Sequence, residues 1–205
     1  INAVTLQTID MGDGADQITN IGSLKTDGGI LMGRGDDTLT TNLYIEATVL
    51  DGGVGNDTLI LNNTTEAGIS GAELGDSNGF DIKNFETIQQ TDGTWNFDGD
   101  YTKSDLLIEG GTAEIQLKKR NQAALAVDSF QIDGGELTID LSKLNSADLT
   151  GTWSVIKGSV SRLSTTSLKI DGETYNIMND GDALEDILGT SPELSSTKRG
   201  LFLTI

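Results

Sequence analysis

The sequence predicts an all-β protein, a right-handed parallel β-helix (solenoid) with a β-rich C-terminal cap. Three observations support this prediction: a glycine-rich motif that recurs in the first third of the chain, apolar segments on both sides of each motif, and a single proline in 205 residues. Two or three short strands with tight turns need about 20 residues to complete one coil, which is the observed period. Proline removes a strand hydrogen bond, so its rarity suits strands that are all paired.

The recurring motif reads x-G-x-G-x-D-x-U-x, where U is Ile or Leu. It occurs three times, as MGDGADQIT, MGRGDDTLT and GGVGNDTLI. Its aspartates are Asp16, Asp37 and Asp57, which lie 21 and 20 residues apart. A repeat of this length is typical of coils that stack on one another. We therefore expect the three aspartates to lie in one column.

Strand-like segments flank each motif and divide the chain into two expected regions. AVTLQTI, GGILM and EATVL precede the motifs, and QIT, DTLT and DTLILN follow them. Residues 1–125 are expected to form parallel β-helix coils with Gly-Asp corners, and residues 126–205 the closing coils and a β-rich cap that covers the sheet edges. A short helix is expected near residues 182–188, with Asp182 as its N-terminal cap and Gly189 at its end.

Composition limits the functions that this chain can have. A formal charge of −19, from 32 acidic and 13 basic residues, disfavours nucleic acid, and no apolar run is long enough to insert directly into a membrane. The chain has no histidine and no cysteine, which removes the commonest general base, thiol catalysis and structural zinc. We assign no catalytic residues and expect a protein that is not an enzyme.

Two further features have structural explanations. Trp95 and Trp153 both follow Gly-Thr and are expected in the core, although aromatic side chains on a β-helix face also stack on sugars. Arg34, Gly35 and Asp36 form the tripeptide that integrins bind on exposed loops. They overlap the second motif, where Gly35 and the neighbouring acid already have a role in the turn, so the structural role is favoured.

The three motifs resemble the RTX nonapeptide GGxGxDxUx, a calcium-binding β-helix repeat. GGVGNDTLI matches every defined position, whereas Met11 and Met32 replace the first glycine in the other two motifs. RTX tracts repeat every nine residues, but here each coil has one motif. The resemblance implies calcium between corners one coil apart, with these ligand residues: Gly12, Gly14, Asp16, Gly33, Gly35, Asp37, Gly53, Gly55 and Asp57. The alternative is that Gly, Asp and Asn make tight turns without metal.

The wider organisation resembles the β-helical passenger segments of Gram-negative autotransporter adhesins. The shared features are Gly-Asp corners once per coil, IKNFETI followed by GTWNFDG, and LTIDLS with GTWSVIKG toward the end, where such passengers have a capping region. The resemblance implies a cell-surface or secreted virulence adhesin, a stalk or binding surface whose partner is a host or bacterial cell-surface receptor, glycan or protein. The alternatives are a polysaccharide-active β-helix enzyme and the C-terminal part of a type I secreted RTX protein.

Overall fold

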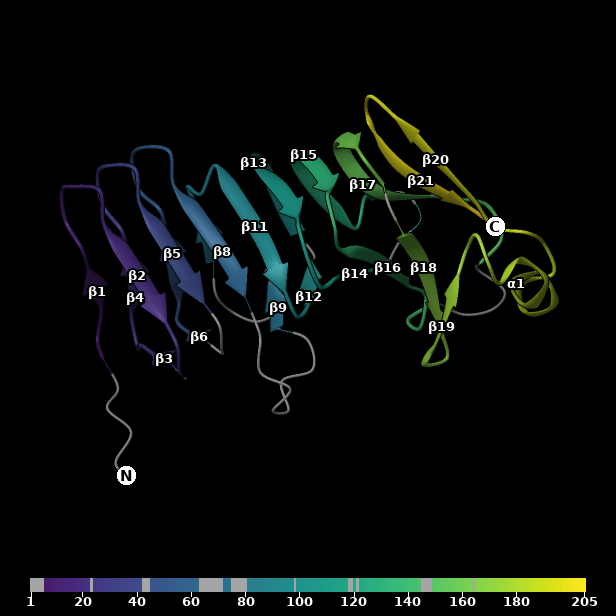
Figure 1. The fold of residues 1–205 in the computed structure, drawn as a ribbon, viewed down its shortest axis with the longest axis horizontal. Coiled ribbons are helices and arrows are strands. Elements are labelled where there is room, and N and C mark those ends of the chain that lie inside the picture. Colours follow the sequence, from purple (N-terminus) through teal and green to yellow (C-terminus); the bar gives the residue numbers. More distant parts are fainter. Residues whose placement is uncertain are drawn as a thin grey trace.

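The protein is mostly β, with 21 strands and one short helix among the residues that the structure describes. The structure is a computed structural model that describes residues 6–22, 24–41, 45–62, 72–74, 81–97, 99–117, 120, 122–144, 149–163 and 165–205. The molecule is elongated, with β1 at one end and the helix and the last two strands at the other (Figure 1). The prediction of an all-β protein is confirmed.

Three open sheets receive strands from the first three repeats. A four-stranded parallel sheet has the order β1 (Ile9–Asp10), β4 (Gly29–Leu31), β7 (Val49–Asp51) and β10 (Asp81–Lys83). A two-stranded sheet joins β3 (Leu24–Lys25) to β6 (Ile45–Glu46). The nine-stranded sheet runs in the order β2 (Gln17–Asn20), β5 (Thr38–Thr41), β8 (Thr58–Asn62), β11 (Thr87–Asp92), β13 (Gly99–Ile108), β15 (Leu125–Ile132), β17 (Thr152–Ser161), β21 (Gly200–Thr204) and β20 (Glu193–Thr197).

A six-stranded sheet continues the stack beyond the third motif. Its order is β19 (Glu173–Asn176), β18 (Thr165–Ile170), β16 (Glu136–Asp140), β14 (Thr112–Gln116), β12 (Thr94–Phe97) and β9 (Ala72–Leu74). From β11 to β18 the chain alternates between this sheet and the nine-stranded one. Parallel pairing therefore extends past residue 125, through β15 with β17 and β16 with β18.

The register of the nine-stranded sheet places equivalent motif positions side by side. Ile18 pairs with Leu39, and Leu39 pairs with Leu59. Side chains alternate along each strand between the core and the outer face, which is the period of two expected for a strand. Both tryptophans belong to the single hydrophobic core, with Trp95 3% and Trp153 2% exposed, which confirms the prediction for them.

Antiparallel pairing appears only at the C-terminal end of the described sheets. β19 pairs with β18 in the antiparallel direction. β20 and β21 form an antiparallel pair, and β21 also pairs with β17 in the antiparallel direction. The helix α1 (Gly181–Leu188) confirms the expected helix, and it ends at Gly189, which has φ of 74°. The expected cap at Asp182 is wrong. The first helical hydrogen bond runs from the amide of Leu184 to the carbonyl of Asp180, so Asp180 is the N-cap residue and Asp182 lies within the first turn.

Candidate metal centre

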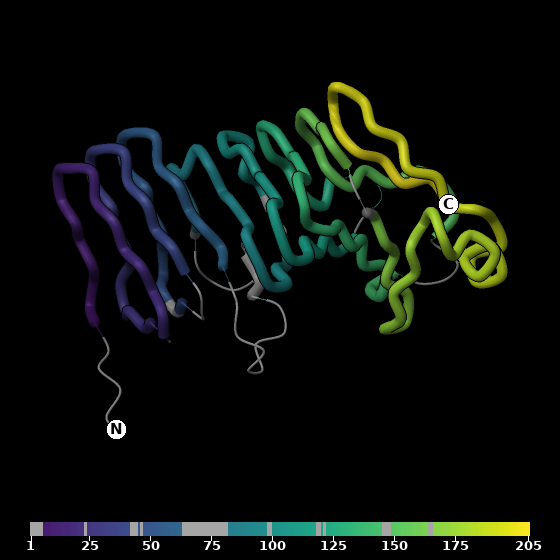
Figure 2. Tube along the Cα trace, viewed as in Figure 1, coloured from purple at the N-terminus to yellow at the C-terminus, as the bar shows by residue number. Residues whose placement is uncertain are grey.

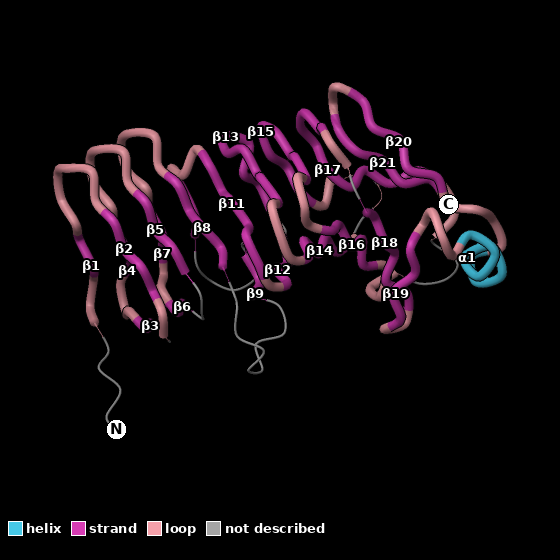
Figure 3. The backbone as a smooth tube through the Cα atoms, viewed as in Figure 1, coloured by secondary structure: helices cyan, strands magenta, loops and turns pink. Residues whose placement is uncertain are grey.

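The corners, meaning the x-G-x-G-x-D turns between β1 and β2, β4 and β5, and β7 and β8, stack directly on one another (Figure 3). Only glycine fits the stacked positions. A Cβ atom at Gly33 would lie 1.8 Å from the carbonyl oxygen of Gly12, and one at Gly35 would lie 1.8 Å from that of Gly14. Both residues also have a positive φ, 107° and 134°, which other residues rarely adopt. The motif glycines therefore have a structural role that needs no metal.

Backbone hydrogen bonds connect each corner to the next. The amide of Arg34 donates to the carbonyl of Gly12 at 2.9 Å, and the amide of Gly14 donates to the carbonyl of Arg34 at 2.7 Å. Val54 makes the same pair of bonds with Gly33 and Gly35, at 2.8 and 2.9 Å. One lone pair on each of the Gly12 and Gly33 carbonyls is thus already used, although the RTX resemblance names these residues as ligands.

The motif aspartates form the expected column, and the carboxylates of Asp37 and Asp57 each reach back to the previous corner. The amide of Asp16 donates to Oδ1 of Asp37 at 2.7 Å, and the amide of Asp37 donates to Oδ1 of Asp57 at 2.8 Å. Asp37 and Asp57 are each only 1% exposed. The Oδ2 atoms of Asp16, Asp37 and Asp57 are shielded from solvent and have no hydrogen-bond partner among the residues that the structure describes. Asp37 and Asp57 therefore each have one oxygen that accepts an amide hydrogen bond and one that is unsatisfied.

A fourth acid, Glu86, extends the column and was missed from the sequence. The amide of Asp57 donates to Oε2 of Glu86 at 2.8 Å. Thr87 pairs with Thr58, so Glu86 occupies the position before its strand that Asp57 occupies before β8. The signal was present, because the triplet E-T-I at residues 86–88 has the acid–x–aliphatic form of D-T-L at residues 57–59. The G-x-G portion of the motif does not precede it.

The surroundings of Asp57 disfavour a negative charge on its carboxylate. Burial raises the pKa of Asp57 above its usual value, and the charges of Asp37, Glu86 and Asp36 raise it further. The hydrogen bond from the amide of Asp37 acts in the opposite direction on this pKa. A proton or a cation near Asp57 would relieve this repulsion.

The donor set fits a hard cation in part. Calcium takes six to eight oxygen ligands, and carboxylate oxygens that lack any other partner are suitable ones. Within the described ranges, no group of three or more His, Cys, Asp or Glu side chains converges as a metal site. The Oδ2 atoms of the column would therefore need carbonyl oxygens or water to complete the coordination of the ion.

The integrin-type tripeptide lies on the second corner. Arg34 and Asp36 are exposed, and the backbone of Arg34 forms bridges with Asp13 on one side and Val54 on the other. Oδ1 of Asp36 accepts a hydrogen bond from the amide of Asn56 at 2.9 Å. The tripeptide is thus part of the corner stack and not of a protruding loop.

Comparisons with known proteins identify no relative. No family model matches the chain, no curated protein matches it, and no solved structure matches its fold. In the part of the chain that is described, no helix has the length and apolar character needed to cross a membrane.

Proposed function

We propose that the chain folds as a right-handed parallel β-helix and acts as a non-catalytic, calcium-stabilised segment of a bacterial surface or secreted adhesin. In its first two repeats the chain passes through β1, β2 and β3, then β4, β5 and β6, and each repeat places one strand, in parallel pairing, in each of the same three sheets. This advance is what winding around a common core requires, and apolar residues of all three repeats belong to one buried cluster or pack against it. Figure 2 shows the successive passes of the backbone side by side. Right-handed connections are the general preference between parallel strands of a sheet.

The calcium part of the proposal rests on one observation, the buried unpartnered Oδ2 atoms of Asp37 and Asp57. A buried polar atom without a partner costs about 1–3 kcal/mol, and a charged one costs more. A calcium ion beside these oxygens removes that cost and the repulsion between neighbouring carboxylates. Extracellular calcium modules have dissociation constants of about 10⁻⁴–10⁻³ M, so such a site would be filled outside the cell and empty in the cytoplasm.

The outer face of the nine-stranded sheet supports a role as a stalk or binding surface. Gln17, Thr38, Thr58 and Thr87 lie next to one another across its strands and alternate with the buried positions. Their amide and hydroxyl groups both donate and accept hydrogen bonds. This face would meet a cell-surface receptor, glycan or protein, at the bacterial surface or in the extracellular medium.

A thermal melt tests the proposal. Protein treated with a chelator is followed by circular dichroism while Ca²⁺ is added back, with Mg²⁺ as the control ion. We expect a rise in melting temperature that continues with the logarithm of the Ca²⁺ concentration above the dissociation constant, corresponding to about 2.7 kcal/mol at a concentration 100 times that constant. No shift, or an equal shift with Mg²⁺, would contradict the proposed calcium site.

A matched pair of variants identifies the site. Asp37→Asn keeps an oxygen that accepts the amide of Asp16 but removes the charge, so the calcium-dependent shift should be lost. Asp133→Asn removes an exposed carboxylate that pairs with Arg162 at 3.1 Å. This control should keep the full shift. Loss of the shift in both variants would indicate a non-specific effect of net charge.

A further inference from the structure

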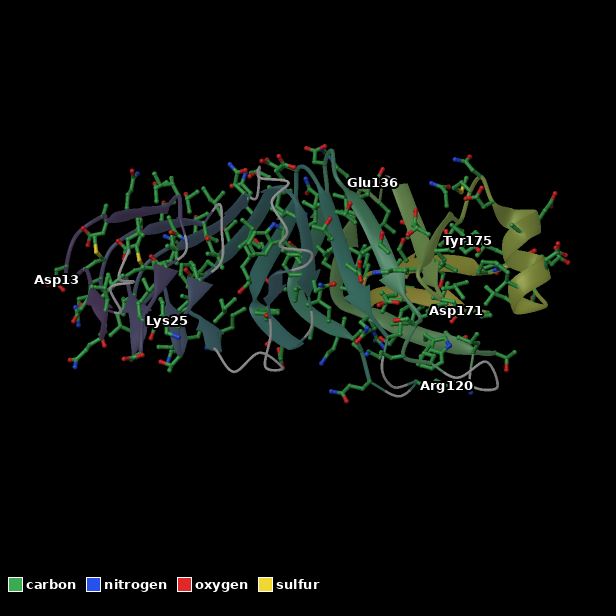
Figure 4. The ribbon with its side chains drawn as sticks, turned by 90° about the horizontal axis from the view of Figure 1, so that it is seen from below. Asp13, Lys25, Arg120, Glu136, Asp171 and Tyr175 are labelled. Carbon is green, nitrogen blue, oxygen red and sulfur yellow. The ribbon has the colours of Figure 1, made fainter. Side chains whose placement is uncertain are left out.

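The outer side of the first repeat lacks the packing that every later repeat has. Met11 and Met32 occupy equivalent motif positions, but Met11 is 36% exposed whereas Met32 is 0% exposed. Ile18 pairs with Leu39 in the sheet, and it is half-buried whereas Leu39 is fully buried. The difference arises because the inner repeats have a neighbour on both sides. Asp13, at the tip of the first corner, lies at the extreme end of the molecule (Figure 4).

The first corner is hydrogen-bonded to the second corner on one side, but its backbone groups on the opposite side have no partner in the described part of the chain. Arg34 uses its amide and its carbonyl on the preceding corner, at Gly12 and Gly14. Asp13 is the equivalent residue of the first corner and forms a bridge with Arg34. Its own amide and carbonyl point away from Arg34, because the bridge uses the groups of the two flanking glycines. They have no partner among the described residues.

The carboxylate of Asp16 also lacks a partner from the described residues on the side of the first corner that faces away from the second corner. Asp37 and Asp57 each accept an amide hydrogen bond from the aspartate of the preceding corner. No hydrogen bond from the described part of the chain reaches the carboxylate of Asp16, and its Oδ2 is already shielded from solvent. The acceptor that would receive the amide of one more aspartate is therefore in place.

The first two motif glycines leave room for another backbone. No atom of the described residues lies within 4 Å of a Cβ atom built at Gly12, and among them only the Asp16 carboxylate, at 3.8 Å, lies near one built at Gly14. At the equivalent positions Gly33 and Gly35, the carbonyl of the preceding corner lies at 1.8 Å. The space above Gly12 and Gly14 thus has the shape that the inner corners fill.

We propose that the first-coil face, formed by Met11, Gly12, Asp13, Gly14, Asp16 and Ile18, is a docking surface for one further coil that carries the same G-x-G-x-D-x-U motif. The docked coil donates its aspartate amide to Asp16 and accepts the amide of Asp13 on its first glycine carbonyl. It continues, with unchanged register, the interface that already joins the first two repeats. This inference rests on the proposed stacked-coil fold.

The described residues of a second copy of this chain do not offer such a coil. Its second and third corners are covered on both sides, and its C-terminal end presents the antiparallel edge strands β19 and β20 in place of a corner. Two first-coil faces brought together would also place Asp13 and Asp16 of one copy near those of the other, which like charges disfavour.

Oxidation of the three methionines measures whether the face is covered. Met32 is the buried reference and Met178, 86% exposed, is the open one. A copy of residues 22–42 fused directly before residue 1 places an added motif 21 residues ahead of the first, the spacing of the first two motifs. Fusion supplies the coil at a high effective concentration. With peroxide and without calcium, we expect Met11 in the fused protein to oxidise about tenfold more slowly, approaching Met32, since oxidation follows exposure.

A glycine variant distinguishes docking from a general effect of the fusion. Gly14→Ala adds a Cβ atom where the added backbone must lie, and it should restore rapid oxidation of Met11 in the fused protein. In the unfused protein, Met11 is exposed and should oxidise rapidly with either glycine or alanine at position 14. The backbone strain that alanine causes at φ of 142° is the same in the fused and the unfused protein, so it does not account for a difference between them. Unchanged oxidation of Met11 on fusion would overturn the proposal, as would protection of Met11 in an unfused protein that light scattering shows to be a dimer. Calcium is omitted from the oxidation experiment. Failure of the fusion to protect Met11 would therefore count against the docking surface alone, and absence of a calcium shift in the melt would count against the calcium site alone.

Discussion

The corner stack, β1 to β8, and the C-terminal end, β17 to β21, hold their strands together in different ways. In the corner stack, strands of 2 to 5 residues repeat by a parallel step of one motif, and the corners bond backbone to backbone. At the C-terminal end, β17 has 10 residues and pairs with its neighbour β21 in the antiparallel direction. Both regions bury apolar side chains, such as Leu39 in the corner stack and Leu203 at the C-terminal end. The corner stack adds to this burial the backbone bonds between its glycine corners and the amide bonds to its aspartates.

The largest expected effect is at a motif glycine. Gly35→Ala should destabilise the corner stack by about 4 kcal/mol or more, because the new Cβ atom meets the Gly14 carbonyl and the backbone has φ of 134°. Hydrogen exchange should show lost protection in β2 and β5 and retained protection in β17 and β21. Gly22→Ala is the control, because no atom in the described part of the chain lies within 4 Å of that Cβ position. Equal loss in both regions would mean that the two ends unfold as one unit.

A smaller effect is expected from apolar truncation within the stack. Leu39→Ala should cost about 3 kcal/mol in urea unfolding, whereas Ile18→Ala, with a neighbour on one side only, should cost about 1 kcal/mol. Leu203→Ala, in β21, is a fully buried reference at the C-terminal end and should cost about as much as Leu39→Ala. Equal costs at Ile18 and Leu39 would show that the first repeat is covered in solution.

A change of the opposite sign is expected at Asp57 in the absence of calcium. Asp57→Asn keeps an oxygen for the amide of Asp37 and removes a buried charge beside Glu86, so it should stabilise the protein by about 1 kcal/mol at pH 7. The same variant should lose stabilisation by calcium. Urea unfolding with chelator and with Ca²⁺ measures both. Destabilisation of the metal-free protein would show that the hydrogen bond from the Asp37 amide stabilises the charged carboxylate by more than burial and Glu86 destabilise it.

The smallest expected effect is on the pH dependence of stability. Burial and neighbouring charges raise the folded-state pKa of Asp57 above 3.8, so the folded protein binds a proton more readily than the unfolded chain. The contribution of Asp57 to the free energy of unfolding should therefore increase as pH falls from 7 toward 4 without calcium. Asp57→Asn should remove this contribution, and the difference between the two proteins isolates it from other carboxylates. An identical pH profile for both proteins would contradict the raised pKa.

Several features could be predicted from local sequence and others could not. The period of the motif gave the column of Asp16, Asp37 and Asp57, because glycine turns and alternating strands are local preferences. Glu86 was missed because it follows Asp57 by 29 residues, well beyond the period of the motifs. The cap of α1 was misplaced because the Asp180 carboxylate accepts the amide of Asn176 at 2.7 Å, so no side chain marks the start of the helix.

The sequence by itself determined the all-β class, the three corners and the acidic character of the chain, since these follow from residue type and spacing. Only the tertiary structure decided which oxygen of each aspartate is used and which is left without a partner. It also decided that the sheets end in antiparallel strands, and that Met11 and Ile18 remain open while their equivalents are buried. These properties depend on neighbours that are distant along the chain, and local preferences do not specify them.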